Sequence, residues 1–71
     1  MKDKRLEKLA NNIRAERNRK NYSQEKLSEL SGVSVSSISL IERKLQVPSI
    51  FVVCQIAKAL EVDIKELLKD I

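Results

Sequence analysis

Apolar residues recur along the chain at spacings of three and four, which is the period of a helix with one buried face. The first such stripe runs from Leu6 to Ile13, and Arg17 continues it on the same side. The pattern predicts a first helix from Asp3 to Lys20.

Two short helices are expected next, with a tight turn between them. Ser23 is a good N-cap for the first, in which Leu27 and Leu30 share an inward face. This helix should end at Gly32, the one glycine of the chain, because a left-handed residue stops a helix. Ser34 then caps the next helix.

That third helix has Ile38 and Ile41 inward at a spacing of three. Four of its residues are expected to face outward: Val35, Ser36, Ser39 and Arg43. Residues 45–47 form a loop, and Pro48 marks a boundary after it.

Ser49 starts a fourth helix, and Asp63 caps a last one. The inner face of the fourth helix is predicted to hold Ile50, Val53, Cys54, Ala57 and Leu60. The last helix is predicted to bury Ile64, Leu67 and Leu68. No strand pattern or repeat is present in the sequence, so we predict an all-α fold of five helices in a single domain, residues 1–71.

Charge is concentrated at one end of the chain. The net charge of the 71 residues is +4, but residues 1–20 hold eight basic and three acidic residues, a net charge of +5. The remaining 51 residues hold six basic and seven acidic residues. A basic element on a nearly neutral body is what polyanion binding requires, and it is equally typical of a solvated basic helix.

The residue types argue against several function classes. With no histidine and one cysteine, an intrachain disulfide is impossible, and we expect no metal and no cofactor. Cys54 lies in an apolar run and is predicted to be a buried structural thiol rather than a nucleophile. No nucleophile–base pair or carboxylate cluster can be assembled, so we expect no enzyme.

The chain is also expected to be soluble and cytoplasmic, with no membrane partner. No apolar stretch approaches the roughly 20 residues of a membrane span. The basic N-terminal residues are not followed by the apolar segment of a secretion signal.

The middle of the chain is similar to the phage repressor and Cro-like helix-turn-helix family, also called Xre-like. The residues that carry the resemblance are 23–34, Ile38-Ser39, Ile41-Glu42-Arg43, Pro48-Ser49 and 56–62. It implies a five-helix lambda-repressor-like domain whose central helix-turn-helix covers residues 23–43. Physically, Gly32 supplies the unstrained turn, Val33 fills the corner from inside, and Ser34 restarts the helix.

The resemblance implies a regulator of transcription that reads the major groove of double-stranded DNA, most simply a dimeric repressor. The implied base-reading residues are Gln24, Val35, Ser36, Ser37, Ser39 and Leu40. The resemblance also implies that Gln24, at a helix N-terminus, lies against a phosphate and reaches the outermost base. The implied phosphate contacts are Arg14, Arg17, Ser23, Ser34, Arg43 and Lys44, with Arg19 and Lys20 as further candidates.

This chain departs from the family at several of these positions. The family commonly reads bases with Arg, Gln or Asn, whereas serines, Val35 and Leu40 offer single hydroxyl bonds and methyl contacts. We therefore expect modest base discrimination, with phosphate contacts and DNA shape carrying a larger share. Lys44 stands where the family often has glycine, so the end of the third helix is expected to be strained or extended.

Two alternative functions remain open from the sequence. One is a restriction-modification controller or an antitoxin-type autoregulator, both of which use similar single domains. The other is a protein-interaction module on the same scaffold, which the uncharged, serine-rich recognition helix favours and the basic first helix disfavours.

Two pairings are also expected. Phe51 and Val52 fall on the outer side of the fourth helix, and we expect a homodimer surface that uses Phe51, Leu68 and Ile71. The family further implies a salt bridge between Arg17 and Glu42 that ties the first helix to the recognition helix.

Overall fold

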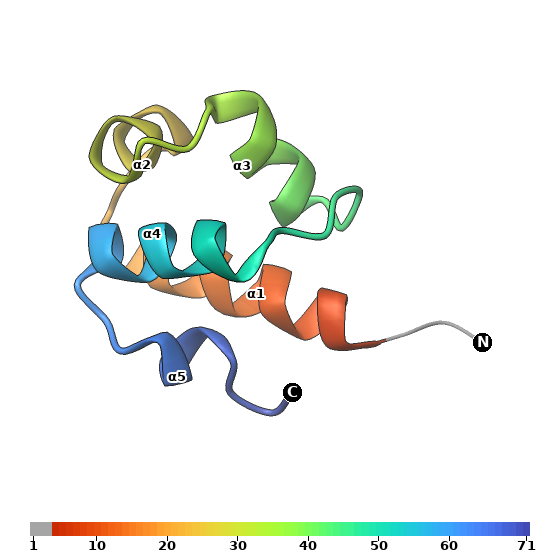
Figure 1. Cartoon of the computed structure of the whole chain (residues 1–71). Helices are drawn as coiled ribbons and strands as arrows, with labels where there is room; N and C mark the ends of the chain where they lie inside the picture. Colours follow the sequence, from red (N-terminus) through yellow and green to blue (C-terminus); the bar gives the residue numbers. More distant parts are fainter. Residues whose placement is uncertain (1–3) are drawn as a thin grey trace.

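The computed structural model describes residues 4–71, which form five helices (Figure 1). They are α1 (Lys4–Arg19), α2 (Gln24–Ser31), α3 (Val35–Glu42), α4 (Ile50–Leu60) and α5 (Ile64–Leu67). Helix α4 packs across α1, the α2–α3 pair lies on one side of these two helices, and α5 lies on the other. The all-α prediction is confirmed, and the predicted start of α1 at Asp3 lies outside the described residues.

Side-chain caps begin four of the helices. The hydroxyls of Ser23, Ser34 and Ser49 each accept a hydrogen bond from a backbone N–H three residues later, at 2.9, 3.1 and 3.2 Å. Asp63 Oδ1 accepts from the N–H of Lys65 at 2.9 Å. A cap of this kind stabilises a helix by about 1 kcal/mol, which matters for helices as short as these.

Three helices end with a non-glycine residue in the left-handed region. These residues are Asn21, Lys44 and Glu61, with φ of 60°, 65° and 58°. At the end of α3 the N–H of Leu45 donates to the carbonyl of Leu40 at 2.8 Å, and the N–H of Lys44 donates to that of Ile41 at 3.0 Å. This is the Schellman arrangement in which glycine is preferred. Lys44 therefore holds a strained conformation, as the sequence predicted.

The corner between α2 and α3 is built as predicted. Gly32 has a φ of 77°, and a Cβ added to it would meet its nearest atom, Nε2 of Gln55, only at 3.9 Å. Glycine is thus favoured by the left-handed backbone conformation rather than by lack of space. Val33 is buried, and its N–H donates to Ser31 Oγ at 3.1 Å.

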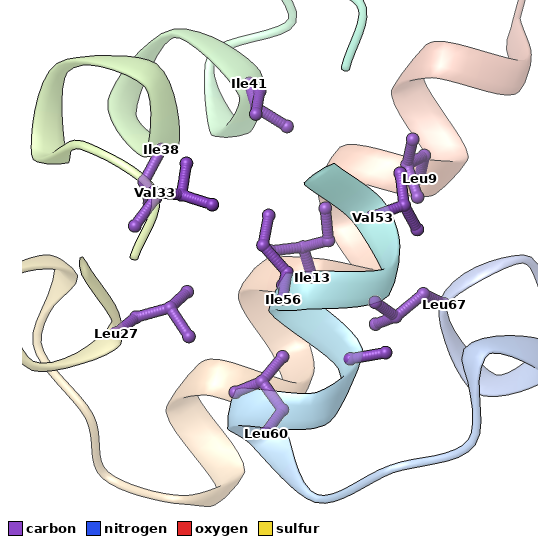
Figure 2. Packing of buried hydrophobic residues seen from close by; sticks show 11 residues of the cluster. Leu9, Ile13, Leu27, Val33, Ile38, Ile41, Val53, Ile56, Leu60 and Leu67 are labelled. Atoms are coloured by element: carbon purple, nitrogen blue, oxygen red, sulfur yellow. The ribbon is translucent and has the colours of Figure 1, made fainter. Parts of the chain in front are cut away.

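The core is apolar and draws on all five helices (Figure 2). Ile13 of α1 and Ile56 of α4 lie at its centre, with Leu27 of α2 and Ile38 of α3 on one side and Leu67 of α5 on the other. This shared core fixes the angle at which α3 is held against α1 and α4.

Several predicted inward positions were wrong. Leu30 is 45% exposed because α2 buries Leu27 and Ser31, four residues apart, and Leu30 lies beside that stripe. In α4 the buried residues are Val53, Ile56, Ala57 and Leu60, so Ile50 and Cys54 are exposed. Ile56 was missing from the predicted inner face.

Two further assignments change at the ends of α4 and α5. Val52 is half-buried and packs against the core, so the outer side of α4 carries Phe51 without it. Leu68 is 37% exposed, because α5 ends at Leu67. The C-terminal segment is instead held to α1 by Asn12, whose Nδ2 donates to the carbonyls of Leu67 and Lys69 at 2.9 and 3.0 Å.

Candidate nucleic-acid interface

The outer face of the helix-turn-helix is a shallow surface groove. It has a volume of about 490 Å³ and is lined by Gln24, Val35, Ser36, Ser39, Leu40 and Arg43. Five of the six predicted base-reading residues are thus brought to one surface. The sixth, Ser37, is half-buried and does not line this groove.

The lining of this groove offers groups that can contact the edges of bases. The Ser36 and Ser39 hydroxyls can each donate or accept one hydrogen bond, and Val35 and Leu40 present methyl groups. Arg43 is exposed at the C-terminal end of α3 with five donors.

Arg17 and Glu42 form a two-pronged ion pair behind this groove. Arg17 Nε donates to Glu42 Oε2 at 2.8 Å, and Nη2 donates to Oε1 at 3.0 Å. The side chains are 14% and 3% exposed. The hydrogen bond to Glu42 raises the pKa of Arg17 above its ordinary value, against an opposing effect of burial. The pairing expected from the sequence is therefore present, and it joins α1 to the end of α3.

Two more groups complete a network around this pair. Arg17 Nη1 donates to the carbonyl of Tyr22 at 2.7 Å, which fixes the segment that leads into α2. Gln24 Nε2 donates to Glu42 Oε1 at 3.2 Å, so the first residue of α2 is joined to the last residue of α3. Sequence reasoning missed this contact, because Gln24 is a polar residue at a helix start and no local pattern directs its side chain toward Glu42.

Arg14 has a structural contact that the sequence did not predict. Its Nη1 donates to the backbone carbonyl of Glu42 at 3.3 Å, and its Nη2 donates to Asn11 Oδ1 at 2.6 Å. A guanidinium at the C-terminus of α3 satisfies a carbonyl there and interacts favourably with the helix dipole. A phosphate contact by Arg14 stays a prediction, and it would have to use the remaining donors.

Other predicted phosphate ligands differ in how far they are already engaged. Arg19 pairs with Glu16 at 2.7 Å, and Lys20 pairs with Glu61 at 2.8 Å, which lowers the pKa of that carboxyl. Lys44 is exposed beyond the end of α3.

The capping hydroxyls offer a different kind of phosphate contact. Ser23 and Ser34 are exposed, and each uses its oxygen as a cap, so the hydroxyl hydrogen remains to donate. A helix N-terminus with a spare donor is suited to an anion.

A second surface groove is apolar and shares no residue with the first. An apolar groove of about 330 Å³ is lined by Arg5, Leu6, Leu9, Val47, Leu68 and Ile71. Phe51 is 77% exposed but does not line this groove. Val47 and Ile50, at 76% and 56% exposure, are further exposed apolar residues that the sequence reasoning did not select for a dimer.

Two other features are absent from residues 4–71. This part of the chain has no helix that is both long and apolar enough to cross a membrane. It also brings no three potential metal ligands together.

Comparison with known proteins agrees with this geometry. A family model described as helix-turn-helix matches residues 13–67. The chain is 40% identical over 60 residues to the control protein C.SmaI of Serratia marcescens, covering 84% of this chain and 71% of that one.

Solved structures give the same result. The restriction-modification controller protein C.AhdI of Aeromonas hydrophila superposes with a TM-score of 0.84 at 34% identity, covering 87% of this chain and 94% of that one. A hypothetical transcription factor, NHTF, from Neisseria superposes with a TM-score of 0.87 at 31% identity, covering 96% and 80%. The chain belongs to the Xre/Cro-like helix-turn-helix family of DNA-binding transcription regulators, which are not enzymes.

Proposed function

We propose that this protein is a controller of the restriction-modification type that binds an operator near its own gene as a homodimer. The observation that carries the proposal is its similarity to two control proteins, one of which it matches over 94% of that protein's length. This corresponds to the second function that the sequence left open rather than to a general repressor.

In the proposed complex, α3 lies in the major groove with the groove-lining residues against base edges. Ser36, Ser39, Val35 and Leu40 make hydroxyl and methyl contacts there. Phosphates on either side are held by Ser23 and Ser34 at the helix N-termini and by Arg43 and Lys44 past the end of α3.

A second copy is needed because one small domain reaches about half of an operator. Two copies would read half-sites about one helical turn, roughly 34 Å, apart. The exposed apolar residues of α4 and the C-terminal segment support this pairing, since Phe51, Leu68 and Ile71 are 77%, 37% and 46% exposed. Leu68 and Ile71 line an apolar groove, into which an apolar side chain of the partner would fit.

The test is protection of the DNA upstream of the protein's own coding sequence from nuclease cleavage. Ser36→Glu places a carboxylate on the exposed face of α3 and should abolish protection. Gln55→Glu makes the same charge change on α4, outside the groove, and should leave protection intact. Two variants with equal protection, or a wild type that protects no site, would contradict the proposal.

A further inference from the structure

The side-chain amide of Gln24 donates a hydrogen bond to the buried carboxylate of Glu42. Gln24 is half-buried, lines the groove on the outer face of the helix-turn-helix, and places Nε2 at 3.2 Å from Glu42 Oε1. Glu42 is itself fixed, because its two oxygens accept from Arg17 Nε and Nη2. The carboxylate therefore cannot turn away to suit a different orientation of Gln24.

This contact decides which end of the amide faces Glu42. A glutamine side chain carries an acceptor oxygen and a donor nitrogen, whereas an ionised carboxylate can only accept. Turning the Gln24 amide over would place its oxygen against the carboxylate oxygen, with no hydrogen between them. In the stable orientation one Nε2 hydrogen of Gln24 is donated to Glu42, and Oε1 and the second Nε2 hydrogen remain for a ligand.

The two groups left over match one base. Adenine presents an N6 amino donor beside the N7 acceptor in the major groove, and a glutamine amide can bind both together. Guanine presents two acceptors, N7 and O6, so O6 would face Gln24 Oε1 without a hydrogen. We propose that Gln24 reads an adenine in each half-site, and that Glu42, fixed by Arg17, is the positioning residue that excludes guanine there.

The composition of the groove makes this contact matter. The side chains of Val35 and Leu40 have no polar atoms. The hydroxyls of Ser36 and Ser39 can donate or accept a hydrogen bond, so these serines can pair with more than one kind of base. Arg43 carries donors only, which suits guanine or phosphate. Among the groove-lining residues, Gln24 is the one with a donor and an acceptor side by side, and so it carries the adenine preference.

The inference rests on the proposed function, and its test starts from the duplexes that wild type enriches from a random pool. We expect an adenine at one position of each half-site. Gln24→Met keeps the length of the side chain but removes both polar groups, and should reduce the adenine-over-guanine preference at that position by about tenfold or more. The matched control, Gln55→Met on α4, should change no position.

Glu42→Gln tests whether Glu42 sets the orientation of the Gln24 amide, while the contact of Gln24 with the base is kept. A glutamine at residue 42 can present either its oxygen or its nitrogen, so the Gln24 amide can turn over. Guanine should then be accepted at the same position while the rest of the preferred sequence is kept. A variant that merely weakened the fold would lower affinity for all duplexes alike. If Glu42→Gln fails to fold, Gln24→Met still decides the question, because Gln24 lies at the surface of the groove.

The hydrogen bond itself can be observed without DNA. In the free ¹⁵N-labelled protein, one side-chain amide hydrogen of Gln24 should exchange slowly with solvent, and Glu42→Gln should abolish that protection. Unprotected Gln24 hydrogens in wild type would overturn the inference. So would unchanged base preferences in Gln24→Met, or an equal loss of affinity for all duplexes, which would indicate a phosphate contact. If wild type enriches no duplex, the proposed function fails and the inference with it.

Discussion

The ion pair between Arg17 and Glu42 should couple the first helix to the recognition helix energetically. Arg17→Met keeps most of the side-chain volume without the charge, and Glu42→Gln keeps the shape without the charge. Each single variant leaves one buried charge without its partner, since the two side chains are 14% and 3% exposed. The double variant removes both charges and leaves neither partner unpaired.

Burial sets the size of the expected losses. Removing one partner from a buried pair costs about 3 to 5 kcal/mol, and we expect the lower end because Arg17 can turn its head group toward water. Two losses of about 3 kcal/mol would sum to about 6 kcal/mol, whereas the double variant, with no unpaired charge, should lose about 3 kcal/mol or less, a coupling of at least about 3 kcal/mol. A chain of this length has a free energy of unfolding of about 4 to 10 kcal/mol, so the single variants should remain measurable.

Urea unfolding of the four proteins, followed by circular dichroism, gives the coupling energy. The pair formed by Lys20 and Glu61 is a natural control, because its ions are also 2.8 Å apart but Glu61 is 70% exposed. The cycle with Lys20→Met and Glu61→Gln should show little coupling, since solvent screens exposed pairs. Losses that add within about 0.5 kcal/mol in the Arg17 cycle would refute the argument from burial.

Three further predictions concern the surface. The logarithm of the DNA-binding constant should fall linearly with the logarithm of the salt concentration, with a slope of about −0.9 per phosphate contact. Arg43→Ala should reduce the size of that slope by about 0.9, the value of one contact, for every duplex. An unchanged slope in a salt titration would show that Arg43 makes no phosphate contact. Lys44→Gly should raise the free energy of unfolding in urea by about 1 kcal/mol, because φ is 65° there, and should weaken DNA binding at the same time. Phe51→Lys should convert the proposed dimer to a monomer in sedimentation without lowering the stability of the monomer, since Phe51 is 77% exposed. A wild type that stays monomeric with a palindromic duplex would contradict the proposed dimer.

Local signals in the sequence were sufficient for the starts of α2, α3 and α5 and for the end of α2. Capping by Ser23, Ser34 and Asp63, and the left-handed turn at Gly32, depend on a few neighbouring residues, and all four are present in the structure. The helix period also identified Ile38 and Ile41 as inward residues of α3, because the residues around them are mostly polar.

The inner face of α4 could not be predicted in the same way. All five residues from Ile50 to Cys54 are apolar, so composition does not distinguish one side of its first turns from another. The choice is made by packing against α1, α2 and α5, which leaves Val53 buried and Cys54 exposed. Leu30 was misassigned for a related reason, since α2 is too short for its stripe to exclude a neighbouring position.

Of the polar contacts in the site, one could be predicted from the sequence and others could not. The pair of Arg17 and Glu42 could be expected because a charge on an apolar stripe needs a partner. The contacts of Arg14 and Gln24 with Glu42 could not, because nothing in the local pattern around Arg14 or Gln24 distinguishes it from a solvent-exposed polar residue. Such contacts depend on the angle between helices, which no local pattern encodes.

The measurement that tests the central claim most directly is enrichment of bound duplexes from a random pool by the wild-type protein. We predict a single family of sequences with two inverted half-sites about one helical turn apart, lost in Ser36→Glu and kept in Gln55→Glu. Enrichment of no sequence, or the same sequences with both variants, would contradict the claim that the outer face of α3 reads DNA.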